Sequence, residues 1–400
     1  MYIISSSSER YLMSLSVLLG IFMLFGGRPA LGCSNVGVSG NGYTATARTM
    51  DFPLSSGGIF GLGKVSDKNT TDLTVLHGGQ KIKALTWTTG HNFLGQTWLG
   101  NSAIFDGVND EGLYTGYFYL PQFTEYPRYD PADPRPALGI MEVTNYLLAT
   151  AGSVSDALER LKKVQVIINA MPMYMPGHDG LFVISPLHIV LRDKKGDSAV
   201  VEWVKGKQNI YPDSGPVITN SPPFDWQVLY AQQFDYVTTE GTAAKFDGVT
   251  MNGTGFGGIP GDWSPPSRFA RAYQIARLSP EPDSMNAALR TALSILESMQ
   301  VPWGTNPSMT VWKTLVDLNN SVYYFQPMFN VIDVEKNKIV SYNPATSWVT
   351  ADLNKIVLEG ALPKGWVRVN VTPTPEGAAK ELADLIKYPE GGPDAIKKLD

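Results

Sequence analysis

Residues 33–51 read Cys33-Ser-Asn-Val-Gly-Val-Ser-Gly-Asn-Gly-Tyr-Thr-Ala-Thr-Ala-Arg-Thr-Met-Asp51. The runs 33–38 and 43–50 are strand-like, and the Asn41-Gly42 pair between them favours a two-residue hairpin turn. With this turn at the tip, the register places Cys33 opposite Met50 and diagonal to Arg48 on the same face. The sequence therefore predicts a cation within reach of the Cys33 thiol.

Asp51 has the wrong parity for the face that Arg48 and Met50 share. Because side chains alternate along a strand, we expect Asp51 to join a site at Cys33 only if the strand ends or bulges there. The following Phe52-Pro53 favours such an interruption. Taken alone, Arg48 would be a solvated strand cation and Asp51 a turn residue.

The first 32 residues have the pattern of a secretory signal peptide. Arg10 precedes an apolar run over 11–25, and the small residues Ala30 and Gly32 stand at positions −3 and −1 of a cleavage site before Cys33. The run has about 15 residues, short of the ~20 that span a bilayer as a helix, so no permanent membrane span is expected. We predict that residues 1–32 are removed and that the protein is exported, to the periplasm or the extracellular medium.

The one cysteine of the chain is also the first residue of this predicted mature protein. An exported protein with a single cysteine cannot form an intrachain disulfide, so its thiol is inert, lipidated or kept for chemistry. Lipidation would make the chain a lipid-anchored, non-catalytic binding protein acylated at Cys33. A lipoprotein signal usually has Leu at −3, whereas this chain has Ala30, which favours chemistry.

A free N-terminal cysteine carries its own general base. An α-amino group with a pKa of about 8 can take the proton of a thiol with a pKa of about 8.5, directly or through one water. It can do so only after the leader is removed, because in the precursor this nitrogen belongs to a peptide bond. A cation near the sulfur would raise the thiolate fraction further.

The composition excludes several classes of protein. The formal net charge is −5 and no basic block occurs, so neither nucleic acid nor an anionic membrane is an expected partner. One cysteine and four scattered histidines exclude a disulfide framework and a cysteine-rich zinc module. The GxGxxG match at 253–258 lacks a strand before it and a helix after it, so a dinucleotide site is not expected. We expect no metal and no organic cofactor.

Residues 33–400 contain no internal repeat and no low-complexity linker, so we expect a single catalytic domain with a frayed tail from about residue 389. Strand patterns dominate up to residue 119 and return at 181–204 and 321–334. Helical spacing is found at 137–150, 155–163, 267–278 and 284–299. This order predicts an α+β fold built of stacked helix and sheet layers.

Four motifs occur in order along the chain. They are Cys33 with Ala47-Arg-Thr-Met-Asp51, Asp106-Gly-Val-Asn-Asp-Glu-Gly-Leu113 with Tyr117-Phe-Tyr-Leu-Pro121, Thr219-Asn-Ser-Pro222 with Phe224-Asp-Trp-Gln227, and Gly261-Asp-Trp-Ser-Pro-Pro-Ser-Arg-Phe269. Together they resemble the choloylglycine hydrolase and penicillin V acylase family of linear amide C–N hydrolases. The resemblance runs from residue 33 to about residue 324, and it implies a four-layer αββα sandwich of the N-terminal nucleophile (Ntn) hydrolase type. Related proteins form tetramers, so a homo-oligomer is a further expectation.

The resemblance assigns six residues to the reaction centre. Cys33 would be the nucleophile, with its α-amine as base. Asn220, through its side-chain amide, and Tyr119, through its backbone N–H, would donate hydrogen bonds to the oxyanion. The remaining three would form the charge network around them: Arg48, Asp51 and Arg268.

Five other side chains are either core filler or the apolar wall of a pocket for an acyl or aromatic group: Phe118, Phe123, Met171, Met173 and Trp226. Bile-salt members of the family tend to have Asn where this chain has Tyr119, and penicillin V members have Tyr. The resemblance therefore implies a preference away from conjugated bile acids.

These observations predict an exported hydrolase that cleaves a linear, non-peptide amide bond through a thioester on Cys33. Its expected partner is a small-molecule acyl amide, as in a penicillin V acylase or an N-acyl-homoserine lactone acylase. The alternatives are a bile salt hydrolase and, from another class, the lipid-anchored binding protein.

Overall fold

The structure of the chain is a computed structural model. It describes residues 2–5, 32–52, 60–71, 73, 82–97, 103–169, 171–173, 181–241, 243–253, 255–302, 308–328, 330–333, 338–342, 349–353 and 368–370. Within these ranges, no helix has the length and apolar character that crossing a membrane requires. The predicted tail from residue 389 lies outside the described residues, as does most of the predicted leader.

Two large sheets form the centre of the fold. The first has eight strands in the order β16 (Lys207–Pro212), β15 (Ser198–Val204), β14 (Leu187–Arg192), β9 (Tyr114–Tyr119), β8 (Ile104–Asn109), β7 (Phe93–Thr97), β4 (Phe60–Gly63) and β25 (Arg368–Asn370). The second has six strands in the order β17 (Val217–Ile218), β2 (Ser34–Gly40), β3 (Tyr43–Phe52), β20 (Met309–Asp317), β21 (Val322–Pro327) and β24 (Val349–Asp352). Neighbouring strands in both sheets are antiparallel, except β4 and β25.

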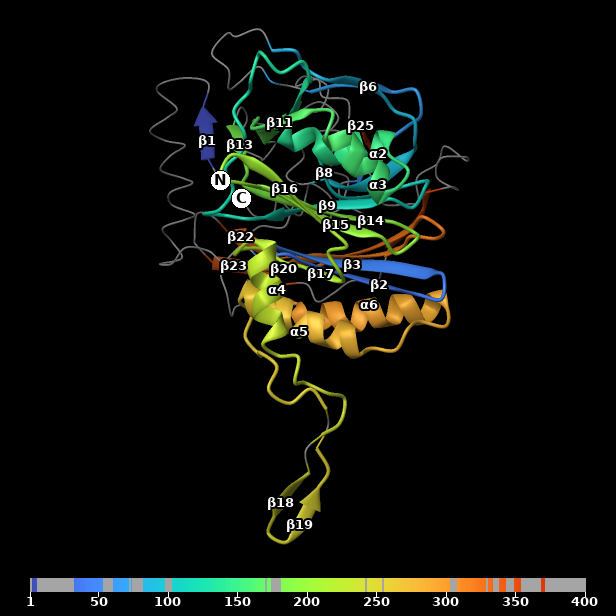
Figure 1. The fold of residues 1–400 in the computed structure, drawn as a ribbon, viewed down its shortest axis with the longest axis vertical. Helices are drawn as coiled ribbons and strands as arrows, with labels where there is room; N and C mark the ends of the chain where they lie inside the picture. Colours follow the sequence, from blue (N-terminus) through green and yellow to red (C-terminus); the bar gives the residue numbers. More distant parts are fainter. Residues whose placement is uncertain are drawn as a thin grey trace.

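The two sheets lie face to face between two layers of helices (Figure 1). On one side, α2 (Val143–Thr150) packs on β8 and β9, and α3 (Val154–Leu161) packs against α2. On the other side, α6 (Met285–Met299) packs on β2 and β3, and α5 (Pro265–Leu278) contacts both α6 and α4 (Phe224–Gln232). Large side chains such as Trp203 and Trp312 are fully buried in this core. The arrangement confirms the predicted α+β fold with αββα layers.

The hairpin of β2 and β3 has the predicted register. Asn41 and Gly42 have positive φ angles of 51° and 83°, as both central residues of a type I′ turn require. The ladder pairs Asn35 with Arg48 and Ser34 with Thr49. The hairpin therefore brings the start of β2, at Cys33, to the level of Met50.

Capping residues that the sequence shows mark the starts of three helices. The hydroxyl of Ser153 caps α3 by accepting the N–H of Asp156 over 3.2 Å, and Ser284 caps α6 in the same way at Ala287. Pro265 opens α5, where the missing N–H costs no helical bond. The predicted helices at 155–163, 267–278 and 284–299 are thus confirmed within two residues at each end.

The helix predicted over 137–150 is wrong in its first half. β10 (Ala137–Gly139) pairs in parallel with β11 (Gln165–Ile167), and a 3₁₀ turn over Ile140–Glu142 precedes α2. The Gly139 N–H donates to Thr71 Oγ1 over 2.7 Å, and the Ala137 N–H donates to the Lys83 carbonyl. Tertiary partners of the backbone therefore outweigh the helical spacing of the apolar side chains.

Smaller pairings complete the chain. They are β1 (Tyr2–Ser5), β13 (Leu181–Ile184) and β12 (Met171–Met173) in one sheet, β5 (Lys68–Thr70) with β6 (Thr86–Thr88), β18 (Ala244–Phe246) with β19 (Val249–Met251), and β22 (Asn330–Asp333) with β23 (Lys338–Tyr342). β1 lies in the predicted leader, so its pairing with β13 would be absent from a chain that starts at Cys33. β18 and β19 form an arm that projects beyond the α4 and α5 layer (Figure 1).

Candidate active site

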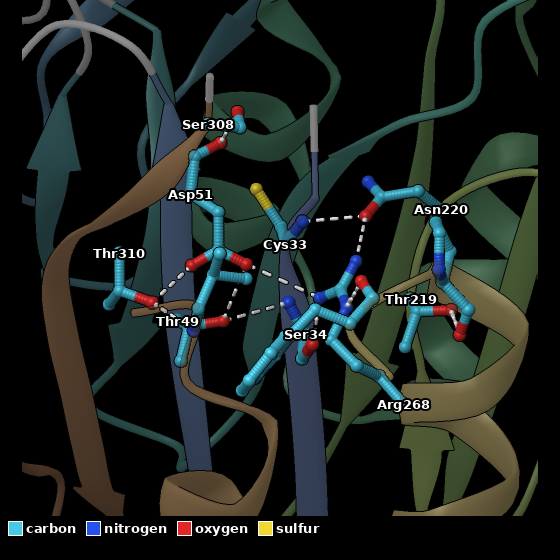
Figure 2. A network of polar contacts seen from close by, with 12 residues as sticks. Cys33, Ser34, Thr49, Asp51, Thr219, Asn220, Arg268, Ser308 and Thr310 are labelled. Carbon is cyan, nitrogen blue, oxygen red and sulfur yellow. Dashed lines mark hydrogen bonds and ion pairs between the residues drawn. The ribbon is translucent and has the colours of Figure 1, made fainter. Parts of the chain in front are cut away.

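Cys33 lies at the start of β2, where the edges of several elements meet (Figure 2). The residue is 5% exposed, and its sulfur lies 3.4 Å from Met50 Sδ and 3.8 Å from Arg48 Nη2. Its backbone N–H donates to Asn220 Oδ1 over 2.6 Å. The sulfur and the nitrogen of one residue therefore face two different polar partners.

Arg48 is fully buried beneath the sulfur, and backbone carbonyls hold its guanidinium in place. Nη1 donates to the Phe105 carbonyl, and Nη2 donates to the Tyr117 carbonyl over 2.6 Å. The guanidinium also lies 4.5 Å from the centre of the Phe118 ring, a cation–π arrangement. The diagonal contact predicted from the hairpin register is thus present.

Two opposing effects act on the Cys33 thiol. Burial raises its pKa above the usual value, because a thiolate loses hydration there, whereas the Arg48 guanidinium lowers it. Burial also works to lower the pKa of Arg48, but the charges of Cys33 and Asp106 outweigh it and raise that pKa. Arg48 therefore stays a cation and is the group that favours a thiolate at this site.

Asp51 reaches the site from the other face of the sheet. β3 ends at Phe52, one residue after Asp51, so the strand itself is not interrupted at Asp51. The irregularity lies on the partner strand, where the register shifts between Thr310 and Trp312. Asp51 therefore faces the α5 layer, and it meets the site because Arg268 reaches it from that helix.

Three partners hold the Asp51 carboxylate (Figure 2). Thr310 Oγ1 donates to Oδ1 over 2.5 Å, Thr49 Oγ1 lies 3.4 Å from Oδ2, and Arg268 Nη1 lies 3.3 Å from Oδ2. Burial raises the pKa of Asp51 to about 6, although Arg268 and Thr310 act to lower it. Asp51 is therefore a carboxylate above about pH 6 and a neutral acid below it.

Arg268 joins the start of β2 to the loop that carries Asn220. Its Nη1 donates to Ser34 Oγ over 2.5 Å, and its Nη2 donates to Asn220 Oδ1 over 3.2 Å. The side chain is 1% exposed, and burial lowers its pKa while the nearby charges of Asp51 and Cys33 raise it. Asn220 Oδ1 thus accepts from both Arg268 and the Cys33 N–H.

The amide nitrogen of Asn220 points toward Tyr119. Asn220 Nδ2 donates to the Tyr119 carbonyl over 2.8 Å and carries a second hydrogen. The Leu120 N–H donates to the carbonyl of Pro186, the residue just before β14. By strand alternation, the N–H and C=O of Tyr119 therefore face the opposite edge of β9, where Asn220 lies. The side-chain amide of Asn220 and the backbone N–H of Tyr119 therefore lie on the same side of the strand.

A small cavity of about 30 Å³ lies beside the sulfur, lined among others by Cys33, Met50, Phe52, Tyr119 and Leu187. None of the five predicted pocket residues is found in the described lining of this cavity, for three different reasons. Phe118 is fully buried behind Arg48, outside the lining of this cavity, because its ring supports the guanidinium. Phe123 and Trp226 are 40% and 47% exposed and do not line this cavity either. Met171 and Met173 belong to β12, but their side chains lie outside the described residues.

The sequence did not point to Thr310 or Gln227. Thr310 contacts Asp51 only because β20 pairs with β3, and no local signal marks it. Gln227 holds the loop of Asn220 through its side-chain amide, which donates to the Asn220 carbonyl over 2.7 Å. Its place in the motif Phe224-Asp-Trp-Gln227 is the one hint that the sequence offers. Among the described residues, no three His, Cys, Asp or Glu side chains gather in a way that could hold a metal ion.

Comparisons with known proteins agree with this geometry. Residues 33–346 match the sequence profile of the linear amide C–N hydrolases, choloylglycine hydrolase family. A penicillin V acylase of Pectobacterium atrosepticum is 27% identical over 330 residues, which cover 74% of this chain and 78% of the relative. A bile salt hydrolase/transferase of Clostridium perfringens is 26% identical over 263 residues, 60% of this chain and 78% of the relative.

Solved structures show the same fold. A mutant of the conjugated bile acid hydrolase of Clostridium perfringens aligns with a TM-score of 0.63 at 22% identity and covers 81% of this chain and 93% of its own. The penicillin V acylase of Agrobacterium tumefaciens aligns with a TM-score of 0.61 at 24% identity and covers 82% and 87%. With the family match over most of the chain, we conclude that this protein belongs to the choloylglycine hydrolase family of linear amide C–N hydrolases, with an Ntn-hydrolase fold.

Proposed function

We propose that this linear amide hydrolase is an exported acylase whose nucleophile is the thiol of Cys33. The observation that carries the proposal is the placement of that residue. Its sulfur lies 3.8 Å from the Arg48 guanidinium, and its nitrogen lies 2.6 Å from Asn220 Oδ1. Removal of residues 1–32 would turn that nitrogen into an amine held beside the thiol by the same contact.

In the first step the α-amine takes the thiol proton, and the sulfur attacks the carbonyl carbon of the substrate amide. The carbonyl oxygen becomes an oxyanion, for which Asn220 Nδ2 and the Tyr119 N–H are the proposed donors. Loss of one such donor typically costs about 100- to 1,000-fold in kcat. The C–N bond then breaks, the protonated amine delivers its proton to the leaving nitrogen, and a thioester remains on Cys33.

In the second step the amine takes a proton from water, and the water oxygen attacks the thioester. The C–S bond breaks, the acid is released, and the sulfur recovers its proton from the amine. Arg48 favours the thiolate in both steps. Arg268 and Asp51 fix the start of β2 and, through Asn220 Oδ1, the orientation of the amide.

Penicillin V is our first candidate substrate, followed by N-acyl-homoserine lactones and then conjugated bile salts. The relative from Pectobacterium atrosepticum is a penicillin V acylase, and it aligns over 330 residues against 263 for the bile salt hydrolase/transferase of Clostridium perfringens. Tyr119 also supports this order, because its half-buried side chain lines the cavity where the resemblance associates Asn with bile-salt members. Hydrolysis of bile salts alone would overturn the order but not the reaction class.

A panel assay tests the proposal. The mature protein and its Cys33→Ala variant are incubated with the three classes of amide, and the released amines are measured. We expect turnover of at least one class by the wild type and none by the variant, with equal circular dichroism spectra. Turnover by the variant would refute Cys33 as nucleophile, and an intact mass several hundred daltons above that of residues 33–400 would instead support the lipid-anchored protein.

We further propose that the protein is a homo-oligomer in which the β18–β19 arm docks on a second copy. The arm exposes Phe246 by 75%, Val249 by 63% and Met251 by 57%. A two-stranded hairpin alone is marginally stable in water, and apolar side chains clustered at its tip lower the free energy once they are covered.

A further inference from the structure

A buried pair of ionisable residues, His188 and Glu202, lies outside the reaction centre described above. His188 is on β14 and Glu202 on the neighbouring β15, next to the cross-strand pair Ile189–Val201. Both side chains are fully buried, and His188 Nδ1 lies 2.9 Å from Glu202 Oε1. Burial of two such groups costs desolvation free energy, which further hydrogen bonds must offset. The other hydrogen bonds of the pair therefore show which part of the chain it holds.

Both partners of the pair contact the backbone of the Asn220 loop. His188 Nε2 lies 3.1 Å from the Thr219 carbonyl, which can only accept, so Nε2 is the donor. Glu202 Oε1 accepts the Phe224 N–H over 3.0 Å. The pair therefore holds the residue just before Asn220 and the residue that starts α4.

Two further contacts fix the residues between these ends. Gln227 Nε2 donates to the carbonyls of Asn220 and Pro222, each over 2.7 Å, and Ser221 Oγ donates to the Pro121 carbonyl over 2.7 Å. Thr219 Oγ1 donates to Gln227 Oε1 and contacts the Pro265 carbonyl at the start of α5, the helix that carries Arg268. These contacts fix the backbone of the loop on both sides of Asn220, and the position of the Asn220 side chain therefore depends on them.

From these contacts we infer that His188 and Glu202 are positioning residues that fix the Asn220 amide for the reaction. The inference rests on the proposed function, in which Asn220 Nδ2 stabilises the oxyanion. His188 reaches Asn220 only through the Thr219 carbonyl. Besides Glu202, the His188 ring meets the edge of the Phe118 ring, at 6.1 Å between ring centres, and the Phe118 ring lies against the Arg48 guanidinium. Loss of the pair should therefore disturb the orientation of the donor and leave the Cys33 thiol in place.

The test compares His188→Leu, His188→Gln and a matched control, Asn109→Ala. Asn109 is also buried, and its Nδ2 bridges the carbonyls of Leu148 and Ala151 at the end of β8 opposite to Phe105, whose carbonyl holds Arg48. Misplacement of a reacting group by about 1 Å can cost about 100-fold, so we expect kcat for penicillin V to fall about 10- to 100-fold in His188→Leu, with KM within about threefold. His188→Gln keeps an N–H donor and should recover most of kcat. Asn109→Ala should lower Tm and leave kcat unchanged.

A double-mutant cycle separates positioning from general damage. In an Asn220→Ala background, His188→Gln and His188→Leu should cost little further kcat, because the group that they position is already gone. Full additivity would overturn the inference, as would a His188→Leu enzyme with wild-type kcat. Alkylation of Cys33 by iodoacetamide should fall much less than kcat in both His188 variants, because Arg48 still lies beside the sulfur. An equal fall of the two rates would show general damage to the site and count against the inference.

A readout independent of turnover distinguishes this inference from the proposed function. Crystal structures of the variants should show the Asn220 side chain displaced in His188→Leu, with its 2.6 Å contact to the Cys33 nitrogen lost, and unmoved in Asn109→Ala. An unmoved Asn220 in His188→Leu would overturn the inference even if the wild type is an active acylase. A wild type inactive on every amide would refute the proposed function, while the displacement would still decide the structural part of the inference.

Discussion

The guanidinium of Arg48 lies 3.8 Å from the sulfur of Cys33 and is held there by two backbone carbonyls. Phe105 and Tyr117 supply those carbonyls from β8 and β9. The side chain of Arg48 therefore crosses from β3, in the six-stranded sheet, to the eight-stranded sheet. The reactivity of a thiol on the second sheet therefore depends on a contact between the two sheets.

Substitution of Arg48 should make the Cys33 thiol less acidic and less reactive. In Arg48→Gln, burial would act on the thiol without the opposing cation, so its pKa should rise further above the usual value. The rate of alkylation by iodoacetamide at pH 7 should then fall about 10-fold, measured by mass spectrometry against time. Arg192→Gln is the matched control, because Arg192 is also buried but binds Asn35, Gly215 and Pro216 and not the sulfur. An unchanged rate in Arg48→Gln, or an equal loss in both variants, would contradict the role of Arg48.

Asp51 should give activity and stability opposite dependences on pH. Its pKa in the fold is about 6 against an ordinary 3.8, so activity that needs the carboxylate should fall as the pH drops through about 6. In the mature chain the α-ammonium is a further cation close to Asp51, so this acid limb is expected at or below pH 6. Asp51→Asn should lower kcat/KM at pH 7 and remove the limb near pH 6, so that only the fall caused by protonation of the α-amine remains. A limb that survives in Asp51→Asn would belong to another group.

The stability effect has the opposite sign. Between about pH 4 and 6 the folded Asp51 binds more protons than the unfolded one, so its contribution to the free energy of unfolding is present below about pH 4 and is lost as the pH rises through about 6. The difference between 3.8 and about 6 corresponds to about 3 kcal/mol. Urea unfolding of wild type and Asp51→Asn at pH 5 and 8 should show about 1.4 kcal/mol of this difference, because only the interval between pH 5 and about 6 lies in that window. Equal pH dependence in the two proteins would show that Asp51 is not titrating in this range.

The hairpin that carries the nucleophile could be predicted from the sequence because a local rule fixes it. An Asn-Gly turn determines the register of β2 and β3, and the register determines that Arg48 meets Cys33. Asp51 could not be placed in the same way. Its partners Thr310 and Arg268 come from β20 and α5, more than 200 positions further along the chain. Only the packing of these elements against β3 shows that Asp51 is part of the site.

The sequence could not decide which apolar side chains line the cavity, for a related reason. An apolar side chain next to a motif can either line a cavity or support a polar residue, and the sequence is the same in both cases. Phe118 supports Arg48, whereas Tyr119, one residue further, lines the cavity because alternate side chains of β9 face opposite sides. The helix predicted over 137–150 was wrong at its start because the backbone pairing of 137–139 with β11 is a long-range interaction.

The exposed arm should control assembly. Replacement of Phe246, Val249 and Met251 by Ser should shift the protein from an oligomer to a monomer in light scattering coupled to size-exclusion chromatography, since these side chains form the apolar tip. Lys245→Ser, on the same strand, is the control and should leave the mass unchanged. A wild type that is monomeric at micromolar concentration would contradict the proposed docking.

A blocked amine should abolish turnover without removing the thiol. An additional Ala placed before Cys33 in the mature chain would convert the base into a peptide nitrogen, and general-base catalysis is typically worth about 100- to 10,000-fold. Intact mass must show that the extra residue is retained. Hydrolysis at the wild-type rate by such a chain would exclude the α-amine as the base.

The most direct measurement is acid quenching of the working enzyme during turnover of penicillin V, followed by intact-mass and fragmentation analysis. We predict a population heavier than residues 33–400 by one acyl group, located on Cys33, with no other change at the N-terminus. An acyl group on any other residue, or an active enzyme that starts elsewhere than Cys33, would contradict the proposed thioester mechanism.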